Sequence, residues 1–272
     1  IIIECEKKIQ TNTLSSLRTA KRRAILLICL ADFGALIDLR DVTRSLSVFA
    51  ENILKLVMDL FVYNEFQRSD CKLFFRNSEN YPIAIHSSAC SVGFTCLGMG
   101  KLGSNELNYS SDIDLIFVFD EERFKPECYS RIRSVFVTIV RQVIKALSEV
   151  TSDGYVFRVD LRLRPDPSTN PVCIGAMAAQ RYYENFGRNW ERAALVKARS
   201  IAGDISTGRK FLDSLQPFIW RKFLDFAAIE DINFIRTKVR KRNPRVIKSN
   251  LLGYNVKTGR GGIREIEFFV QT

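Results

Sequence analysis

Apolar positions repeat with helical spacing along the first part of the chain. Between Leu14 and Phe66 they recur every three or four residues, which predicts an all-helical opening segment. The stretch from Cys71 to Ser91 is rich in Asn, Pro and Ser, and this composition indicates a loop. We therefore expect residues 1–80 to form a helical leader.

The pattern then changes to that of extended structure. Residues 93–98 and 113–119 are short runs of β-branched and aromatic side chains, which predict two neighbouring strands. Helical spacing returns at residues 127–152, and alternation at residues 155–163 predicts a third strand. These elements together form a small α/β unit, which we place at residues 81–175.

The remaining chain, residues 176–272, is predicted to form a helical bundle. Helical spacing dominates from Cys173 to Asn255, and a Gly-rich turn at residues 258–262 precedes a last apolar run. That turn either opens a helix whose N-terminus meets an anion or closes the bundle onto the α/β unit. The whole chain is therefore predicted to be an α+β protein, mostly helical.

Composition narrows the function classes. The formal net charge of +11 favours an anionic partner such as a nucleotide, a nucleic acid or an acidic protein surface. His86 is the only histidine and the seven cysteines are scattered, so a zinc site is not expected. Unpaired thiols without a secretory leader indicate a cytoplasmic protein. The apolar run at residues 24–31 is too short to span a membrane. Both ends of the sequence suggest a fragment of a longer protein.

Two carboxylates share one face of the second predicted strand. Asp112 and Asp114 are two residues apart, so both point away from the core that Ile113 and Leu115 face. Like charges at this spacing repel, and a divalent cation with a preference for hard oxygen ligands, such as Mg²⁺, relieves that repulsion. For an arbitrary Asp-x-Asp, a strand entrance with one helix cap and one solvated acid is the commoner explanation.

The third predicted strand repeats the arrangement. Its alternation places Asp160, Arg162 and Arg164 on one face, so three carboxylates and two arginines are expected to converge. This combination fits phosphoryl or nucleotidyl transfer, with two metal ions held by the carboxylates and the arginines stabilising phosphate charge. An aspartate flanked by arginines is otherwise a surface ion pair of small energetic value.

A glycine-rich turn precedes the carboxylate pair. Residues 98–104 end the first strand in small residues, so backbone N–H groups near Gly103 and the hydroxyl of Ser104 are candidates for binding phosphate. Taken alone, the turn is nearly as well explained as a simple hairpin connection. The Asp-x-Asp that follows it favours the phosphate-binding interpretation.

These residues resemble a known family. The string from Gly98 to Phe117, GMGKLGSNELNYSSDIDLIF, and the segments 159–166, 181–192, 194–199 and 261–268 closely resemble the glutamine synthetase adenylyltransferases, members of the polymerase-β-like nucleotidyltransferase superfamily. The resemblance covers most of the chain from about residue 93 onward. It implies a polymerase-β-like catalytic unit in which Asp112, Asp114 and Asp160 hold Mg²⁺.

The sequence of residues 182–190, YYENFGRNW, is similar to the amino-terminal of the two catalytic domains in that family. The resemblance implies the deadenylylating half, which removes AMP from a tyrosine of glutamine synthetase by phosphorolysis and releases ADP. Inorganic phosphate is then the nucleophile, and a nitrogen-sensing signal protein is the regulatory partner. The reverse reaction, transfer of AMP from ATP to the tyrosine, is the alternative.

Basic residues in the helical half supply further candidates. Lys197 and Arg199, placed on a predicted helix with Trp190, Glu191 and Arg192, are candidates for binding nucleotide phosphates. We interpret Trp190 and Glu191 as packing and ion-pair residues. The basic run at residues 236–245 is a solvated face or a dock for an acidic protein. A nucleic-acid-binding or regulatory module without turnover is the third hypothesis, which the carboxylates argue against.

Overall fold

A computed structural model provides the three-dimensional description of the chain. It describes residues 13–68, 71–77, 79, 81–82, 85–220, 255–257, 259 and 261–271. Within this part the protein combines helices with a mixed β-sheet, which confirms the predicted α+β class.

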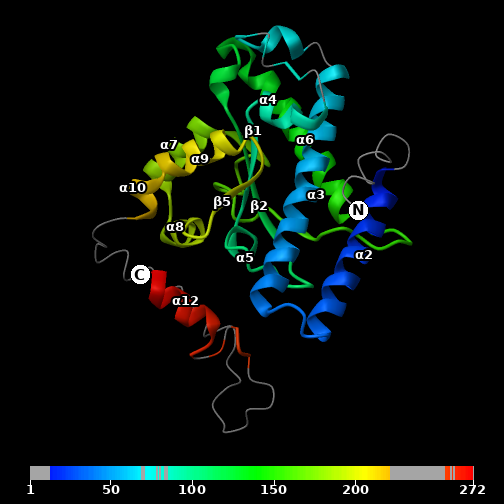
Figure 1. Cartoon of the computed structure of the whole chain (residues 1–272). Coiled ribbons are helices and arrows are strands. Elements are labelled where there is room, and N and C mark those ends of the chain that lie inside the picture. The colour runs from blue at the N-terminus through cyan, green and yellow to red at the C-terminus, as the bar shows by residue number, and fades with distance from the viewer. Residues whose placement is uncertain are drawn as a thin grey trace.

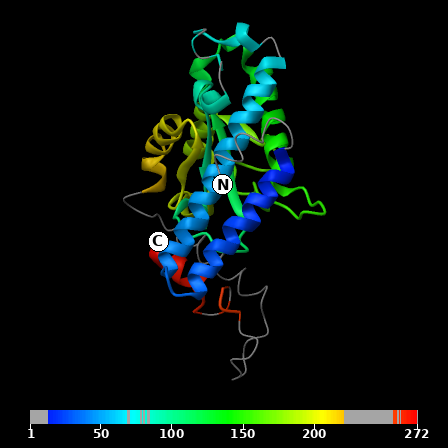
Figure 2. The same ribbon diagram turned by 45° about the vertical axis from the view of Figure 1, so that its right-hand side comes forward.

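The opening segment is helical, as its spacing predicts. Helix α2 (Thr13–Phe33) and helix α3 (Leu39–Arg68) lie side by side (Figures 1 and 2). The inner face of α3 carries the fully buried side chains Ile53, Leu54 and Val57. Short helical turns follow instead of an irregular loop: η1 (Cys71–Phe74), η3 (Ile85–Ser87) and α4 (Ser88–Ser91).

The centre of the molecule is a five-stranded sheet. Its strands are β1 (Phe94–Gly98), β2 (Ile113–Phe119), β3 (Val159–Asp160), β4 (Cys173–Gly175) and β5 (Arg199–Gly203). The order is β3-β2-β1-β5, and β4 pairs with β2 beyond the end of β3. Strand β1 is antiparallel to β2 and β5, whereas β3 and β4 run parallel to β2. The two neighbouring strands predicted at residues 93–98 and 113–119 are therefore confirmed as β1 and β2.

Helices cover both faces of this sheet (Figure 1). On one face α3 and α6 (Tyr129–Ser148) pack against Leu115 and Phe117 of β2. On the other, α7 (Ala176–Phe186), α8 (Asn189–Leu195), α9 (Ile205–Ser214) and α10 (Gln216–Ile219) surround Ile116 and Val118. Because both faces are covered, β2 is an uninterrupted apolar run after its first two residues.

The structure corrects two sequence expectations. The third strand is only two residues long, because the chain turns after Asp160, whose carboxylate accepts the Arg162 N–H at 2.8 Å. Consequently Asp160, Arg162 and Arg164 do not share a strand face. The stretch after Cys173 is not purely helical either, since β5 adds a strand to the sheet beside β1. The sheet therefore extends past residue 175, where the sequence placed the end of the α/β unit.

The remaining elements are short. Helix α5 (Gly100–Gly103) follows β1, turns η4 (Glu121–Arg123) and η5 (Pro126–Cys128) precede α6, and α12 (Ile263–Gln271) follows the glycine-rich turn. None of the helices in the described ranges is long and apolar enough to cross a bilayer. The six cysteines of these ranges carry free thiols.

Candidate functional site

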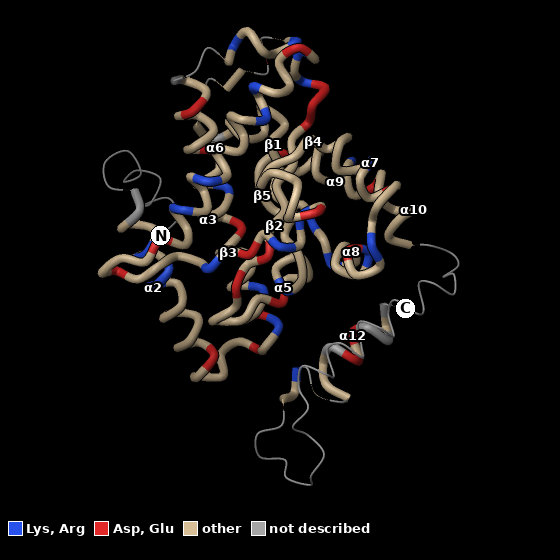
Figure 3. The backbone as a smooth tube through the Cα atoms, turned by 180° about the vertical axis from the view of Figure 1, so that it is seen from behind, with Lys and Arg blue, Asp and Glu red and all other residues tan. Residues whose placement is uncertain are grey.

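Strand pairing brings the predicted carboxylates together. Strand β2 places Asp114 directly beside Asp160 of β3, because Ile113 pairs with Val159 one position earlier. Ile113 and Leu115 are fully buried, whereas Asp112 is exposed and Asp114 half-buried, so the alternation expected for this strand is confirmed. Acidic and basic segments adjoin one another around β2, β3 and α5 (Figure 3).

Asp114 has a strongly perturbed carboxylate. Burial, followed by repulsion from Asp160 and Asp112, raises its pKa from 3.8 to about 6, although Arg162 and Lys257 act in the opposite direction. A carboxylate held this close to two others needs a cation or a proton to relieve the repulsion. The arrangement therefore has the electrostatic character of a cation site.

We expect Asp114→Asn to stabilise the metal-free fold at neutral pH. The pKa of Asp114 is about 6 folded and near 3.8 unfolded, so the folded state binds more protons between these values and stability falls as pH rises through this window. After allowance for solvent screening of a half-buried group, we expect about 1–2 kcal/mol at neutral pH. Urea unfolding with a chelator measures the difference. A difference that is the same at about pH 4 and about pH 7 would contradict the assignment.

The other two carboxylates are paired with arginines. Asp112 accepts a hydrogen bond from Arg158, which also donates to the Ser110 carbonyl at 2.7 Å. Asp160 accepts from Arg162 Nε at 2.8 Å, and this bond, ahead of other effects, lowers the pKa of Asp160. Arg158 is a site residue that sequence analysis missed. It immediately precedes β3, two residues before Asp160, and that position was the available signal.

The three Asp carboxylates are suitable ligands for a hard divalent cation, but their present arrangement does not form a complete coordination site. Three Asp side chains offer the oxygen ligands that Mg²⁺ prefers. In the described ranges, however, no group of three His, Cys, Asp or Glu side chains is close enough to hold a metal as they stand. In this arrangement Asp112 is paired with Arg158 and Asp160 with Arg162, so each of these two carboxylates has an arginine as its partner.

A Mg²⁺ ion at these carboxylates would be bound more tightly after replacement of Arg158 by Ala. The guanidinium competes for the Asp112 carboxylate, and its removal also lowers the positive charge around the site. Because both groups are half-exposed, we expect a change of about three- to tenfold in the Mg²⁺ dissociation constant. Calorimetric titration with Mg²⁺ measures it, and Arg131→Ala, an exposed arginine on α6, is the matched control. Weaker Mg²⁺ binding in Arg158→Ala would show that Arg158 supports the cation site instead.

A pocket of about 640 Å³ contains all three carboxylates. Its wall is formed by β2, β3, α5, α8 and α12. The lining residues that carry charge are Lys101, Asp112, Asp114, Arg158, Asp160, Arg162, Lys197, Lys257 and Glu267. Four aspartates and glutamates thus lie among five lysines and arginines, which is a suitable environment for metal ions and the phosphates that they bind.

Gly100 and Lys101 are the part of the glycine-rich turn that reaches this pocket. Gly100 has a left-handed backbone with a φ of 51°, and a Cβ there would lie 3.6 Å from an Asp114 oxygen. Gly103 and Ser104, the predicted phosphate ligands, are not among the described lining residues. The Ser104 hydroxyl instead donates to the Gly100 carbonyl or the Glu106 carboxylate, both at 2.9 Å.

Arg199 holds the glycine-rich turn in place. From β5 it donates to the carbonyls of Gly103 at 2.9 Å and Leu102 at 3.2 Å, and to the Asn105 side chain at 2.7 Å. It also pairs with Glu51 of α3. These contacts direct the guanidinium to the turn, and Arg199 is absent from the described lining of the pocket. The structure therefore gives Arg199 a role in positioning the turn.

Lys197 lies inside the pocket between two carboxylates. Its ammonium is 3.0 Å from Glu267 of α12 and 3.6 Å from Glu106. Burial lowers its pKa, but the bond to Glu267 and both negative charges outweigh that effect, and the pKa lies above its ordinary value. Lys197 follows the end of α8 and Arg199 is on β5, so neither lies on the helix that the sequence predicted.

Several other sequence expectations have plain outcomes. Arg164 donates to the carbonyls of Leu161 at 2.9 Å and Pro167 at 2.8 Å, and so shapes the loop after β3 without lining the described pocket. Glu191 is buried and accepts the Tyr182 hydroxyl at 3.0 Å, which confirms its packing role, whereas Trp190 lines the pocket. The basic run at residues 236–245 lies outside the described residues.

Comparisons with known proteins agree with the resemblance. The family model described as glutamate-ammonia ligase adenylyltransferase matches residues 1–214. A second model, the GlnD PII-uridylyltransferase, matches residues 233–272.

Curated relatives match nearly the whole chain. It is 43% identical over 259 residues to the bifunctional glutamine synthetase adenylyltransferase/adenylyl-removing enzyme of Rhizobium meliloti, covering 95% of this chain and 25% of that protein. The enzyme of the same name from Bartonella henselae is 42% identical over 273 residues, covering 100% and 27%. The chain therefore spans about a quarter of the length of these relatives, and the matched part is their N-terminal quarter.

Proposed function

Because the chain belongs to the glutamate-ammonia ligase adenylyltransferase family, we propose that its carboxylate pocket removes AMP from an adenylylated tyrosine of glutamine synthetase. The proposed reaction is phosphorolysis, which releases ADP. The sheet of β1, β2 and β3 with its carboxylates would then be a polymerase-β-like nucleotidyltransferase unit. The names of the relatives include both adenylyl transfer and adenylyl removal, so each direction is represented among them.

One observation carries this proposal. The parallel pairing of β2 with β3 puts Asp160 beside Asp114, at the wall of a pocket that also contains Asp112 and several cationic side chains. Nucleotidyl transfer depends on positioning phosphates and neutralising their charge, and it needs little covalent chemistry from the protein. An acidic cluster that can hold metal ions, surrounded by lysines and arginines, is suited both to positioning phosphates and to neutralising their charge.

The proposed roles follow from the positions of the side chains. Asp112, Asp114 and Asp160 would hold Mg²⁺, with two ions as the expected number, which when bound would neutralise charge on the reacting phosphates. Lys101 on α5 and Lys197 after α8 reach the pocket from two sides and would bind nucleotide or inorganic phosphate. Arg158 and Arg162, released from Asp112 and Asp160 when these carboxylates turn to a cation, would become available to phosphate oxygens.

The proposed chemistry balances without an added oxidant or reductant. An oxygen of inorganic phosphate forms a bond to the phosphorus of the tyrosine-linked AMP, and the bond from that phosphorus to the tyrosine oxygen breaks. The products are ADP and tyrosine, whose oxygen takes up a proton. Phosphate is already ionised at neutral pH, so it requires alignment more than a protein base.

The test is ADP formation from adenylylated glutamine synthetase with Mg²⁺, in the presence and absence of inorganic phosphate. Phosphate-dependent ADP formation supports the proposal. AMP incorporation from ATP into unmodified glutamine synthetase, without phosphate-dependent ADP, would replace it with the adenylylating reaction. Salt-sensitive binding to nucleic acid without either turnover would favour the non-catalytic alternative.

The proposed partners follow from the same family. Glutamine synthetase is the protein substrate, phosphate, ADP and ATP are the small ligands, and a nitrogen-sensing signal protein is the regulator. We place the reaction in the bacterial cytoplasm, the compartment of this metabolic function.

A further inference from the structure

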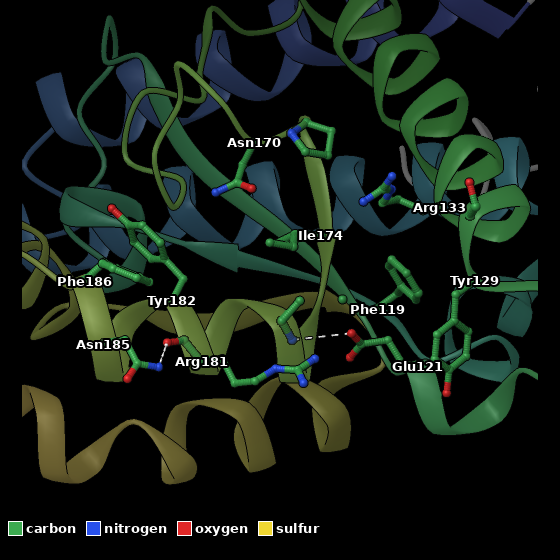
Figure 4. Close-up of a pocket in the computed structure, with 14 residues that line it drawn as sticks. Phe119, Glu121, Tyr129, Arg133, Asn170, Ile174, Arg181, Tyr182, Asn185 and Phe186 are labelled. Carbon is green, nitrogen blue, oxygen red and sulfur yellow. Dashed lines mark hydrogen bonds between the residues drawn. The ribbon is translucent and has the colours of Figure 1, made fainter. Parts of the chain in front are cut away.

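A second pocket lies at the opposite end of β2 from the carboxylates. It has a volume of about 520 Å³ and lies between the first turns of α6 and the outer face of α7, where β2 and β4 end (Figure 4). Among the described residues, none lines both this pocket and the carboxylate pocket. Its size is within the range of small-molecule sites in proteins.

Two arginines enter this pocket from different walls. Arg133 belongs to α6 and Arg181 to α7, and Figure 4 shows both side chains at the pocket. Each side chain is exposed. Among the residues that the structure describes, neither guanidinium donates a hydrogen bond or forms an ion pair. Two such cations at one concave surface favour an anionic ligand.

The carboxylate in the described lining of this pocket is already engaged. Glu121 is 7% exposed and accepts the N–H groups of Met177 at 2.7 Å and Ala178 at 3.4 Å, at the start of α7. Gly175 permits this approach, since a Cβ there would lie 2.0 Å from the carboxyl carbon of Glu121. Burial raises the pKa of Glu121, and these two amides, ahead of the more distant charge of Arg181, act against that rise. The helix amides thus satisfy both oxygens of Glu121, and among the described residues neither arginine forms an ion pair with it, so the arginines can bind an external anion.

The walls between the arginines are apolar and aromatic. Phe119 and Ile174 form part of the lining near the sheet. The rings of Tyr182 and Phe186 are adjacent on α7, with centroids 6.4 Å apart. Phe186 is 72% exposed, which is unusual for a phenylalanine and leaves a ring face open to a flat ligand.

Two amide side chains add hydrogen-bond acceptors. The Asn170 nitrogen donates to the Pro165 carbonyl at 3.1 Å, and the Asn185 nitrogen to the Arg181 carbonyl at 2.8 Å. These bonds fix each amide, and its carbonyl oxygen receives no hydrogen bond from the described residues. Such oxygens accept from the exocyclic amine of a heteroaromatic base.

We propose that this pocket binds a nucleoside phosphate, with its base against Tyr182 and Phe186 and its phosphate at Arg133 and Arg181. An inorganic anion alone would leave the aromatic wall unused, and an uncharged aromatic ligand would leave both arginines unused. Within its described lining the site has no carboxylate available for a metal ion, so it is a binding site and not a second centre of nucleotidyl transfer. A bound nucleotide would join α6 to α7, which cover opposite faces of the sheet.

Calorimetric titration with AMP in the presence of a metal chelator tests this proposal. We expect saturable binding to the wild-type chain, and an affinity weaker by at least about tenfold in Arg133→Gln with Arg181→Gln. Both side chains are exposed, so the substitutions should leave the fold intact. The matched control is Arg131→Gln with Arg209→Gln, an exposed pair that is absent from the described lining and should keep wild-type affinity.

Further variants separate this pocket from the carboxylate site. Asp112→Asn with Asp114→Asn should bind AMP as the wild type does, whereas Phe186→Ala should bind it several-fold more weakly. Adenosine and inorganic phosphate should each bind more weakly than AMP. No saturable AMP binding, unchanged affinity in the Arg133 and Arg181 variant, lost affinity in the carboxylate variant, or phosphate binding equal to that of AMP would overturn the proposal. None of these outcomes depends on ADP formation from adenylylated glutamine synthetase, so they test this pocket separately from the proposed reaction.

Discussion

A chain carrying Asp112→Asn and Asp114→Asn is expected to release ADP from adenylylated glutamine synthetase at least about a thousand-fold more slowly than the wild type. Amide side chains preserve the shape of the pocket but remove two of its three aspartate charges. They also remove the Asp114 carboxylate, whose pKa is raised by burial and, after it, by repulsion from Asp160 and Asp112. The variant should therefore be at least as stable as the wild type while it loses activity.

The matched control is Asp213→Asn, which makes the same chemical change on the exposed side of α9. It should retain wild-type turnover. Thermal unfolding of both variants shows whether lost activity reflects lost structure. Retention of more than about a tenth of wild-type turnover by the double variant would exclude these carboxylates as the centre of the reaction.

Gly103→Ala should cause a large loss of stability. A Cβ at Gly103 would lie 1.9 Å from the Lys197 carbonyl oxygen and 2.5 Å from that of Gly98. Both obstacles are backbone atoms, so relief requires the chain between α8 and β5 to shift. We expect a loss of about 3 kcal/mol or more in the free energy of unfolding, and disturbed turnover because Lys197 moves with that backbone.

Gly154→Ala provides the comparison. Gly154 has a left-handed φ of 82°, and a Cβ added there would meet no atom within 4 Å, so the expected cost is backbone strain alone. That strain amounts to about 1–2 kcal/mol. Gly103 lacks the left-handed conformation, and its cost is steric. Urea unfolding measures both. Equal losses in the two variants would show that the close approach of the Lys197 carbonyl does not restrict Gly103.

Hydrophobic periodicity predicted those helices and strands well whose buried side, or both of whose sides, leave a clear pattern in the sequence. Helix α6 has its apolar residues at helical spacing because one side packs on the sheet, and β2 is an apolar run because both of its faces are covered. Strand β5 was missed since its five residues lie between two helices and begin with an arginine. Its assignment depends on pairing with β1, about a hundred residues earlier, which local pattern does not contain.

The carboxylates of the site were predictable, but their partners were not. The period of a strand places Asp112 and Asp114 on one face, whereas only the register with β3 places Asp160 beside them. Arg199 matched the expectation of a phosphate-binding cation by residue type alone. In the fold its donors meet the carbonyls of Leu102 and Gly103, a contact between two parts of the chain that spacing along the sequence does not reveal.

The most direct test of the proposed reaction follows the phosphorus atom of inorganic phosphate. Adenylylated glutamine synthetase is incubated with the chain, Mg²⁺ and radiolabelled inorganic phosphate, and the nucleotide products are separated. Phosphorolysis predicts that the label appears in ADP, in an amount equal to the AMP lost from glutamine synthetase, and that the variant with Asp112→Asn and Asp114→Asn produces almost none. Loss of AMP from glutamine synthetase with unlabelled nucleotide products would contradict phosphorolysis by this site.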